Sequence, residues 1–340
     1  MTFGRPAAIP NSYVKLELPS DYKLTDELPI SNSQVDALGL AFFNSTITLY
    51  KQMWNTMELL YGQNLGCDSS LSVSQTIAHT FSIEQSVFSW ERSLPDTLRL
   101  TSCESLRNDR SESATNLQSV TWKLRVILTL RYLNLRVLLH RPVLVKFLDS
   151  CSGLQTDAQE LKLLQQMGLN SLQICADSAI EIIDLVHHVV SSTGWKQELL
   201  GAWWFSLYYT FNAALVIFGT IRVCRDESRT GASMPILVDR AKSYPSRATA
   251  ALLKLDTGNR MVDRCRLFLE RFNSSLSTPE QNPLSSDSTT HFNLSGSGPM
   301  AFGGEMDYSP LGMEFGEFMM DGDLLSLMSR PDIPPQADLQ

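Results

Sequence analysis

The stretch Leu117–Pro142, LQSVTWKLRVILTLRYLNLRVLLHRP, decides the fold class of this chain. Its apolar residues recur every three or four positions, which places them on one face of a helix of about seven turns. They are Leu117, Val120, Leu124, Ile127, Leu128, Leu135, Leu138 and Leu139. Because proline lacks an amide donor and clashes with the preceding turn, Pro142 is expected to end the helix. We predict a scaffold helix without a catalytic group on its buried face, with His140 and Arg141 complementing the dipole at its carboxyl end.

The rest of the hydrophobic pattern also indicates helices. No convincing strand pair and no internal repeat of solenoid length is present. The expected helical segments are residues 33–62, 71–93, 143–148, 158–191, 196–224, 236–255 and 259–273, with a polar connection at 101–115. We predict an all-α fold, a multi-helix domain of long amphipathic helices around a central buried helix.

The central helix of this prediction could be mistaken for a membrane span. Residues 199–221, LLGAWWFSLYYTFNAALVIFGTI, carry no charge and are long enough to cross a bilayer. A protein core can satisfy the polar groups of this segment, whereas lipid cannot. These groups belong to Ser206, Tyr208, Tyr209, Thr210, Asn212 and Thr220. The neighbouring amphipathic helices would also lose their packing partner, so we expect a buried helix and no membrane interaction.

Length and charge narrow the possible functions. The 340 residues suffice for one large domain or two smaller ones. The net charge of −8 argues against nucleic-acid binding through a broad basic surface. Arg260, Arg264 and Arg271 form a modest basic stripe, for which a solvated helix face is the simpler interpretation. Residues 1–10 contain no apolar core of signal-peptide length, so an intracellular location is expected.

Motifs for catalysis or metal binding are absent from the sequence. It contains no nucleophile elbow, no phosphate-binding glycine loop, no His-Glu-x-x-His and no Rossmann fingerprint. The six cysteines are far apart, which predicts reduced, mostly buried thiols rather than a zinc cluster or a disulfide framework. His187 and His188 are adjacent, so on a helix they point about 100° apart and cannot face one metal together. We predict a non-enzyme with no catalytic, cofactor-binding or metal-binding residue.

The composition changes sharply after about residue 275. Residues 276–300 are rich in Ser, Thr, Pro, Gly and Asn, which is typical of a disordered linker. Residues 301–340 form an acidic-hydrophobic tail whose first 29 positions carry six acids and no Lys or Arg. Such a segment can enter a partner's groove as a short helix, and the candidate partner-binding residues are Phe315, Phe318, Met319, Leu324, Leu325 and Met328. A terminus without a role, or one that docks back on the body, is the alternative.

Three short segments stand out by their order and spacing. They are FGRPAAIP at residues 3–10, WERSLPDTL at residues 90–98 and LHRP at residues 139–142. With the Trp-rich segment near residue 203 and the acidic end, they resemble the regulatory domain of the fungal zinc-cluster transcription factors, called the middle homology region. The resemblance covers about residues 1–275, the C-terminal portion of that domain. Its motif residues here are Gly4, Arg5, Pro6, Trp90, Leu94, Pro95, His140, Arg141 and Pro142.

The resemblance implies a nuclear regulator of RNA polymerase II transcription, whose acidic tail recruits transcription co-activator machinery. In that family an N-terminal binuclear zinc cluster with six closely spaced cysteines reads DNA, and no such cluster occurs in these 340 residues. Zinc and direct DNA contact therefore belong to no residue of this chain, and DNA binding is expected only through the missing domain. We expect either a gene model truncated at its 5′ end or a regulator that has lost its DNA-reading part.

Two further functions stay open. The chain could be a DNA-free interaction module that heterodimerises with or titrates full-length relatives, or that forms a dimer with itself. It could also be an α-helical enzyme or small-molecule binder, which would need an apolar pocket with convergent polar groups. The candidates for such a pocket surround Trp203, Tyr208 and Asn212.

Overall fold

Helices build the described part of this protein. The computed structural model describes residues 17–19, 33–62, 71–109, 114–151, 157–256 and 258–277. Within these ranges every regular element is helical and no strand occurs, which confirms the all-α fold class. The predicted tail and almost all of the predicted linker lie outside the described residues, so these segments stay predictions.

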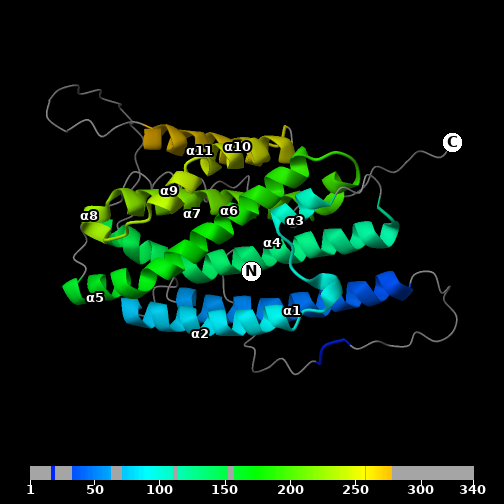
Figure 1. Ribbon diagram of the computed structural model, residues 1–340, viewed down its shortest axis with the longest axis horizontal. Coiled ribbons are helices and arrows are strands. Elements are labelled where there is room, and N and C mark those ends of the chain that lie inside the picture. Colours follow the sequence, from blue (N-terminus) through cyan, green and yellow to red (C-terminus); the bar gives the residue numbers. More distant parts are fainter. Residues whose placement is uncertain are drawn as a thin grey trace, which may run out of the picture. The chain divides into compact units, whose positions relative to one another are not determined.

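The helices lie on either side of α4 (Asn116–Cys151), as Figure 1 shows. On one side, α1 (Ser33–Tyr61) and α2 (Val73–Arg92) pack on each other and on α4. The helix α2 begins with a capping box, in which the Ser72 side chain accepts from the Gln75 amide and the Gln75 side chain accepts from the Ser72 amide. Both helices match the predicted segments 33–62 and 71–93.

Two further layers cover the other side of α4. There α6 (Leu169–Ser191) and α7 (Trp203–Arg225) pack on each other and on α4. Next, α10 (Tyr244–Leu255) covers α6 and α7, and α11 (Arg260–Ser277) packs mainly on α10 (Figure 1). Both sets of helices therefore rest on α4.

The predicted apolar stripe accounts for only part of the burial of α4. Leu117, which we placed on the buried face, is 37% exposed. Further along, the helix is buried on nearly all sides, at Val126, Leu128, Thr129, Leu130, Tyr132, Leu133, Asn134, Leu135, Val137, Leu138, Leu139 and His140. This central stretch is covered by helices from both directions, so it has no solvent face.

The helix α4 does not end at Pro142, so the predicted stop was wrong. Pro142 cannot donate to the carbonyl four residues earlier, that of Leu138. The Tyr61 hydroxyl of α1 donates to that carbonyl instead, at 2.7 Å. On the other flank, the Thr80 hydroxyl of α2 donates to the Leu139 carbonyl at 3.4 Å. The Tyr61 hydroxyl thus replaces the missing amide, and the segment 143–148 belongs to the same helix.

The helix α7 is the segment with the length and composition of a membrane span. In the described body, 67% of its apolar window is buried, and it packs on α4, α6 and α10. Two polar groups along it are satisfied within the helix: the Thr220 hydroxyl donates to the Val216 carbonyl and the Asn212 amide donates to the Tyr208 carbonyl. The buried Thr210 hydroxyl has no hydrogen-bond partner among the described residues. This environment is that of a core helix, as predicted. It begins at Trp203, after a 3-10 turn at Gly194–Leu199.

The predicted helix 158–191 is continuous but changes its winding. It starts as α5 (Ala158–Leu163), passes through a π-helical turn at Leu164–Gly168 and continues as α6. Gly168 fits because a Cβ there would lie 2.9 Å from Leu164 Cδ1 and 3.1 Å from Phe147 Cε2. Close packing against α4 therefore accompanies the widened turn.

Shorter helices fill the remaining segments. The predicted helix 236–255 is divided into α9 (Pro235–Ala241) and α10, because Pro245 in the first turn of α10 suits a helix start. The predicted polar connection contains α3 (Cys103–Asn108), and α8 (Glu227–Thr230) follows α7.

Candidate functional site

Of the residues proposed from sequence, those of the tail and Gly4, Arg5 and Pro6 lie outside the described residues. Of the other motif residues, Trp90 and His140 each contact a residue across the packing of α2 on α4. The Trp90 ring stacks on Tyr132 of α4 with centroids 5.9 Å apart and planes 19° apart. Its indole N–H donates to the Ser45 carbonyl at 3.1 Å and to the Thr48 hydroxyl at 3.0 Å. One buried indole therefore joins α1, α2 and α4.

Leu94 and Pro95 form the corner after α2. Pro95 is extended, and its carbonyl accepts from the Leu98 amide at 2.9 Å, which starts the 3-10 turn Asp96–Leu98. Leu98 is fully buried, and its turn contacts both α1 and α4. The segment WERSLPDTL thus redirects the chain and anchors the corner with one leucine.

Glu84 of α2 lies between two side chains of α4. Arg136 donates from Nε and Nη2 to Glu84 Oε1, at 3.2 and 2.8 Å. His140 Nε2 lies 3.2 Å from Glu84 Oε2, and His140 Nδ1 lies 2.8 Å from the Ser171 hydroxyl of α6. Glu84, His140 and Ser171 are buried. This polar network, Glu84–Arg136–His140–Ser171, crosses from α2 through α4 to α6.

The partners determine the protonation of this network. A carboxylate can only accept, so His140 Nε2 carries the proton and Nδ1 accepts from the Ser171 hydroxyl. Burial lowers the pKa of His140, and the interactions with Glu84 oppose this without reversing it. Burial raises the pKa of Glu84, but hydrogen bonds and charge interactions with His140 and Arg136 outweigh it and leave the pKa lowered. The geometry fits an ionised Glu84–Arg136 pair beside a neutral imidazole.

The network is suited to holding helices together and not to catalysis. A general base must reach the proton that it abstracts, and His140 has no exposed surface. Among the described residues, no group of three His, Cys, Asp or Glu side chains could hold a metal ion. The predicted role of His140 at a helix end was wrong, because α4 continues for more than two turns beyond it.

Arg141, the next motif residue, contacts α1 instead. Its Nε donates to the Tyr61 hydroxyl at 3.2 Å, and its guanidinium carbon lies 5.3 Å from the centre of the Tyr61 ring. Burial raises the pKa of the Tyr61 hydroxyl, although Arg141 opposes the shift. The neutral hydroxyl can therefore accept from Arg141 and donate to the Leu138 carbonyl at the same time.

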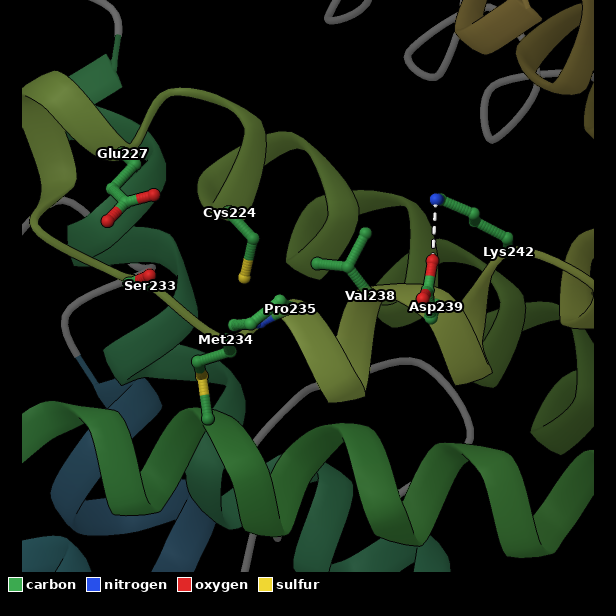
Figure 2. A pocket seen from close by; sticks show the side chains of 8 residues that line it. All are labelled: Cys224, Glu227, Ser233, Met234, Pro235, Val238, Asp239 and Lys242. Carbon is green, nitrogen blue, oxygen red and sulfur yellow. Dashed lines mark hydrogen bonds and ion pairs between the residues drawn. The ribbon is translucent and has the colours of Figure 1, made fainter.

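A surface pocket of about 210 Å³ opens near the end of α7 (Figure 2). It is lined by Cys224, Glu227, Ser233, Met234, Pro235, Val238, Asp239 and Lys242. Lys242 donates to the Asp239 carboxylate at 2.7 Å, the dashed line in Figure 2, so these charges already have partners. Burial and the nearby Glu227 raise the pKa of Cys224 to about 11, which makes the thiol a poor nucleophile. The pocket is also smaller than the roughly 300–1,000 Å³ of typical ligand sites.

The other groups considered from sequence have ordinary environments. His187 and His188 are both half-buried on α6, and burial lowers the pKa of each. The described cysteines are free; Cys103, Cys151, Cys175 and Cys265 are buried and Cys224 is half-buried, as predicted for reduced thiols. The arginines of the basic stripe on α11 each make an interaction within the chain.

Sequence reasoning missed Glu84, Arg136, Tyr61 and Ser171. A signal existed for the first, because Glu84 falls among buried apolar positions of α2 and would need a cation beside it. Arg136 and His140 are four residues apart, the spacing that places two side chains on one helix face. Neither pattern predicts that α2 packs against this face of α4.

Comparison with known proteins gives two relatives. The chain is 28% identical over 305 residues to Transcription factor FBD3 of Gibberella moniliformis and 30% identical over 277 residues to Transcription factor FBD3 of Fusarium pseudograminearum. These matches cover 86% and 79% of this chain but 38% and 35% of the relatives, so the chain spans little more than a third of their length. No family model and no solved structure matches. The chain is thus a distant homologue of a fungal transcription factor.

Proposed function

We propose that this chain is a transcription regulator of the fungal zinc-cluster family, acting in the nucleus on RNA polymerase II transcription. The observation that carries the proposal is the similarity to two transcription factors along most of the chain. The motif residues of α2 and α4 support it, because they form the contacts that join α1, α2, α4 and α6. We interpret the helical body, in which these contacts join four helices, as a scaffold for regulation.

In this proposal, DNA is read by a part of the protein or by a partner outside these 340 residues. The chain has a net charge of −8 and no closely spaced cysteines. Counterion release drives most DNA binding and requires clustered Lys and Arg side chains. The described body therefore contributes protein contacts, and zinc would belong to the DNA-reading part.

The acidic tail at residues 301–340 is the proposed activating segment. Its acids, six of which lie within residues 301–329, keep it soluble, and its aromatic and aliphatic side chains can enter an apolar groove of co-activator machinery as a short amphipathic helix. Phe315, Phe318 and Leu324 carry this role together with Met319, Leu325 and Met328.

The tail is tested by fusing residues 286–340 to an unrelated DNA-binding domain and measuring a reporter gene. We expect activation, and its loss when Phe315, Phe318 and Leu324 are all changed to alanine. The matched control changes Phe292, Leu294 and Met300 to alanine in the same fusion, because these apolar residues lie among Ser and Gly without neighbouring acids. Equal activity of both triple variants, or no activation by the unchanged fusion, contradicts the proposal.

A second candidate is a DNA-free interaction module that heterodimerises with or titrates full-length relatives. This candidate also fits the net charge of −8 and the lack of zinc-cluster spacing within these 340 residues. Affinity purification of the full chain from its host separates the two candidates. The module predicts a stoichiometric zinc-cluster relative in the complex, whereas the activator predicts co-activator subunits that depend on Phe315 and Phe318.

A further inference from the structure

Residues 17–19, the short dark-blue segment in Figure 1, lie against α1. The Asn44 side chain of α1 donates from Nδ2 to the Pro19 carbonyl at 2.9 Å. The other polar atom of this amide, Oδ1, is buried and has no hydrogen-bond partner among the described residues. A backbone in extended form offers both a carbonyl and an N–H to such an amide. One half of this pairing is present at Asn44, and the other half lacks its N–H.

The outer side of α1 carries an apolar stripe beside this contact. Leu38 and Leu49, about three turns apart, are buried and mark the inner side of the helix. At about 100° per residue, Leu40 and Ile47 lie roughly opposite to that line, and Phe43 lies between them along the helix. These three residues, the outer stripe, stay partly exposed, Phe43 by 52%. The helices α2 and α4 reach α1 through hydrogen bonds at other residues, which are Ser45, Thr46 and Thr48.

The sequence around residues 17–19 fits such a surface. In YVKLELP, residues 13–19, apolar Val14, Leu16 and Leu18 alternate with two charged residues. This alternation places the apolar side chains on one side of an extended chain, and the described residues 17–19 are not helical. Two residues of an extended chain advance by about 6.6 Å and one turn of a helix by about 5.4 Å. Neighbouring apolar side chains of this segment can therefore meet neighbouring turns of α1.

We propose that residues 13–19 form a strap that binds in extended form on the outer stripe of the same chain. Its three apolar side chains cover the stripe, and the Asn44 amide pairs with its backbone through both polar atoms. The outer stripe is thus a surface for one kind of partner, an extended peptide that has apolar residues two positions apart and ends in Leu-Pro. Because this surface belongs to the helical body, the strap stands or fails independently of the proposed function in transcription.

The connection between the strap and α1 permits this contact within one molecule. Asn44 lies 11 residues after Ser33, the first residue of α1, which is about 16 Å along the helix. Residues 20–32 connect Pro19 to that helix, and these 13 residues can span up to about 43 Å. A short connection raises the effective concentration of the strap at the stripe. The strap of the same chain therefore outcompetes the strap of a second copy.

Limited trypsin digestion of the full chain tests the strap, because trypsin cleaves after Lys15 within it. A bound strap must be released before it can enter a protease, so its cleavage follows the population of the released form. Asn44→Ala should speed cleavage after Lys15 by about 3- to 10-fold, the effect of one lost hydrogen bond. Phe43→Ser, at a position that is 52% exposed, should speed it as well.

Asn55→Ala is the matched control. Asn55 is a half-buried asparagine about three turns further along the same side of α1. Its loss should leave cleavage after Lys15 unchanged. Circular dichroism checks that all three variants keep their helices. Cleavage rates that are equal in the unchanged chain and in the Asn44 and Phe43 variants overturn the proposal.

A fluorescently labelled peptide of residues 11–22 tests the same surface from outside. The receptor is the full chain with Leu16→Ser and Leu18→Ser, whose own strap has lost most of its apolar side. We expect saturable binding to this receptor by fluorescence anisotropy, and at least about tenfold weaker binding to the unchanged chain, in which the strap competes. A peptide with Lys15→Ser and Glu17→Ser, changed on the charged side, should bind the receptor equally well. No binding, or equal binding to both chains, overturns the proposal.

The strap of a second copy is the alternative occupant of the outer stripe. In that case protection of Lys15 would rise with protein concentration, and light scattering would report a dimer that Asn44→Ala weakens. This result overturns the contact within one chain. Protection that is independent of concentration in a monomer supports it.

Discussion

Glu84 is a carboxylate in the middle of an apolar helix face. Ile83 and Val87 beside it are buried, and Glu84 itself is 5% exposed. A buried charge costs several kcal/mol unless a counter-charge and hydrogen bonds accompany it, and here Arg136 and His140 supply both. The residues of this network therefore depend on one another more strongly than their separate hydrogen bonds indicate.

Removing the charge of Glu84 tests this dependence. Glu84→Gln leaves the Arg136 guanidinium without its anion and places an amide donor near the His140 proton. We expect a loss of about 3 kcal/mol in the free energy of unfolding, measured by urea denaturation. Glu91→Gln is the control, because the half-buried Glu91 carboxylate accepts, within the described part of the chain, only from the neutral Tyr132 hydroxyl, at 2.9 Å. A loss at Glu84 no larger than the control value contradicts the proposed role.

Acid should destabilise the body partly through His140. Its pKa in the folded chain is lowered from 6.5, so the unfolded chain binds the proton first. Its contribution to stability is therefore present above pH 6.5 and is lost as the pH falls through the folded-state pKa. His140→Gln should flatten the dependence of unfolding free energy on pH by up to about 1.4 kcal/mol per pH unit below 6.5. An unchanged slope shows that His140 is not buried as a neutral group.

At the scale of elements, α4 depends on its neighbours for its continuity. Pro142 removes one helix hydrogen bond, and the freed Leu138 carbonyl accepts from Tyr61 of α1. The same tyrosine holds Arg141, so one side chain stabilises the helix backbone and orients a cation. Pro142 therefore lies next to the point where Tyr61 of α1 binds the backbone of α4.

This coupling predicts a double-mutant cycle. Tyr61→Phe should cost about 1–3 kcal/mol, because a buried carbonyl loses its donor. In a Pro142→Ala background the new amide can donate to Leu138, so the cost of Tyr61→Phe should fall by about 1 kcal/mol. Tyr50→Phe is the control on α1, since its hydroxyl donates to no described residue. Strict additivity of the Tyr61 and Pro142 changes shows that the two residues do not share the carbonyl.

The π-helical turn between α5 and α6 gives a second prediction for an element. At Gly168 an added Cβ would crowd Leu164, Phe147 and Val143, the last at 3.2 Å. Gly168→Ala should therefore cost about 1–3 kcal/mol through overpacking. At Gly39 of α1 no atom lies within 4 Å of an added Cβ, so Gly39→Ala should stabilise by up to about 1 kcal/mol. Thermal unfolding of both variants checks the opposite signs; shifts of one sign would contradict the packing at Gly168.

Sequence patterns predicted the helices better than they predicted the contacts between helices. The helix 33–62 was found almost to the residue because its apolar period is regular and Gly62 follows it. The stop at Pro142 failed because the compensating hydroxyl lies 77 residues away in sequence. Similarly, Trp90 and His140 were singled out as motif residues, but their partners Tyr132 and Glu84 depend on the packing of α2 on α4. These predictions failed or stayed incomplete because the contacts join segments far apart in sequence, and no local pattern encodes such pairing.

At the scale of the whole molecule, the chain combines a helical body with a C-terminal segment of different composition. In the body, contacts that join α1, α2, α4 and α6 include three residues singled out in the sequence, Trp90, His140 and Arg141. The chain matches little more than a third of the length of its relatives. Our proposal therefore assigns DNA reading to a part of the protein or to a partner outside these 340 residues. The net charge of −8 fits a role in protein contacts.

The most direct test of the central claim, that this chain regulates transcription, is a genome-wide measurement of transcripts in host cells that lack the chain and in cells that overproduce it. The account predicts one limited gene set that falls on deletion and rises on overproduction, with the rise lost when Phe315, Phe318 and Leu324 are alanine. A gene set that changes in the opposite sense would favour the titrating module. Transcripts that stay unchanged under both conditions would contradict a role in transcription.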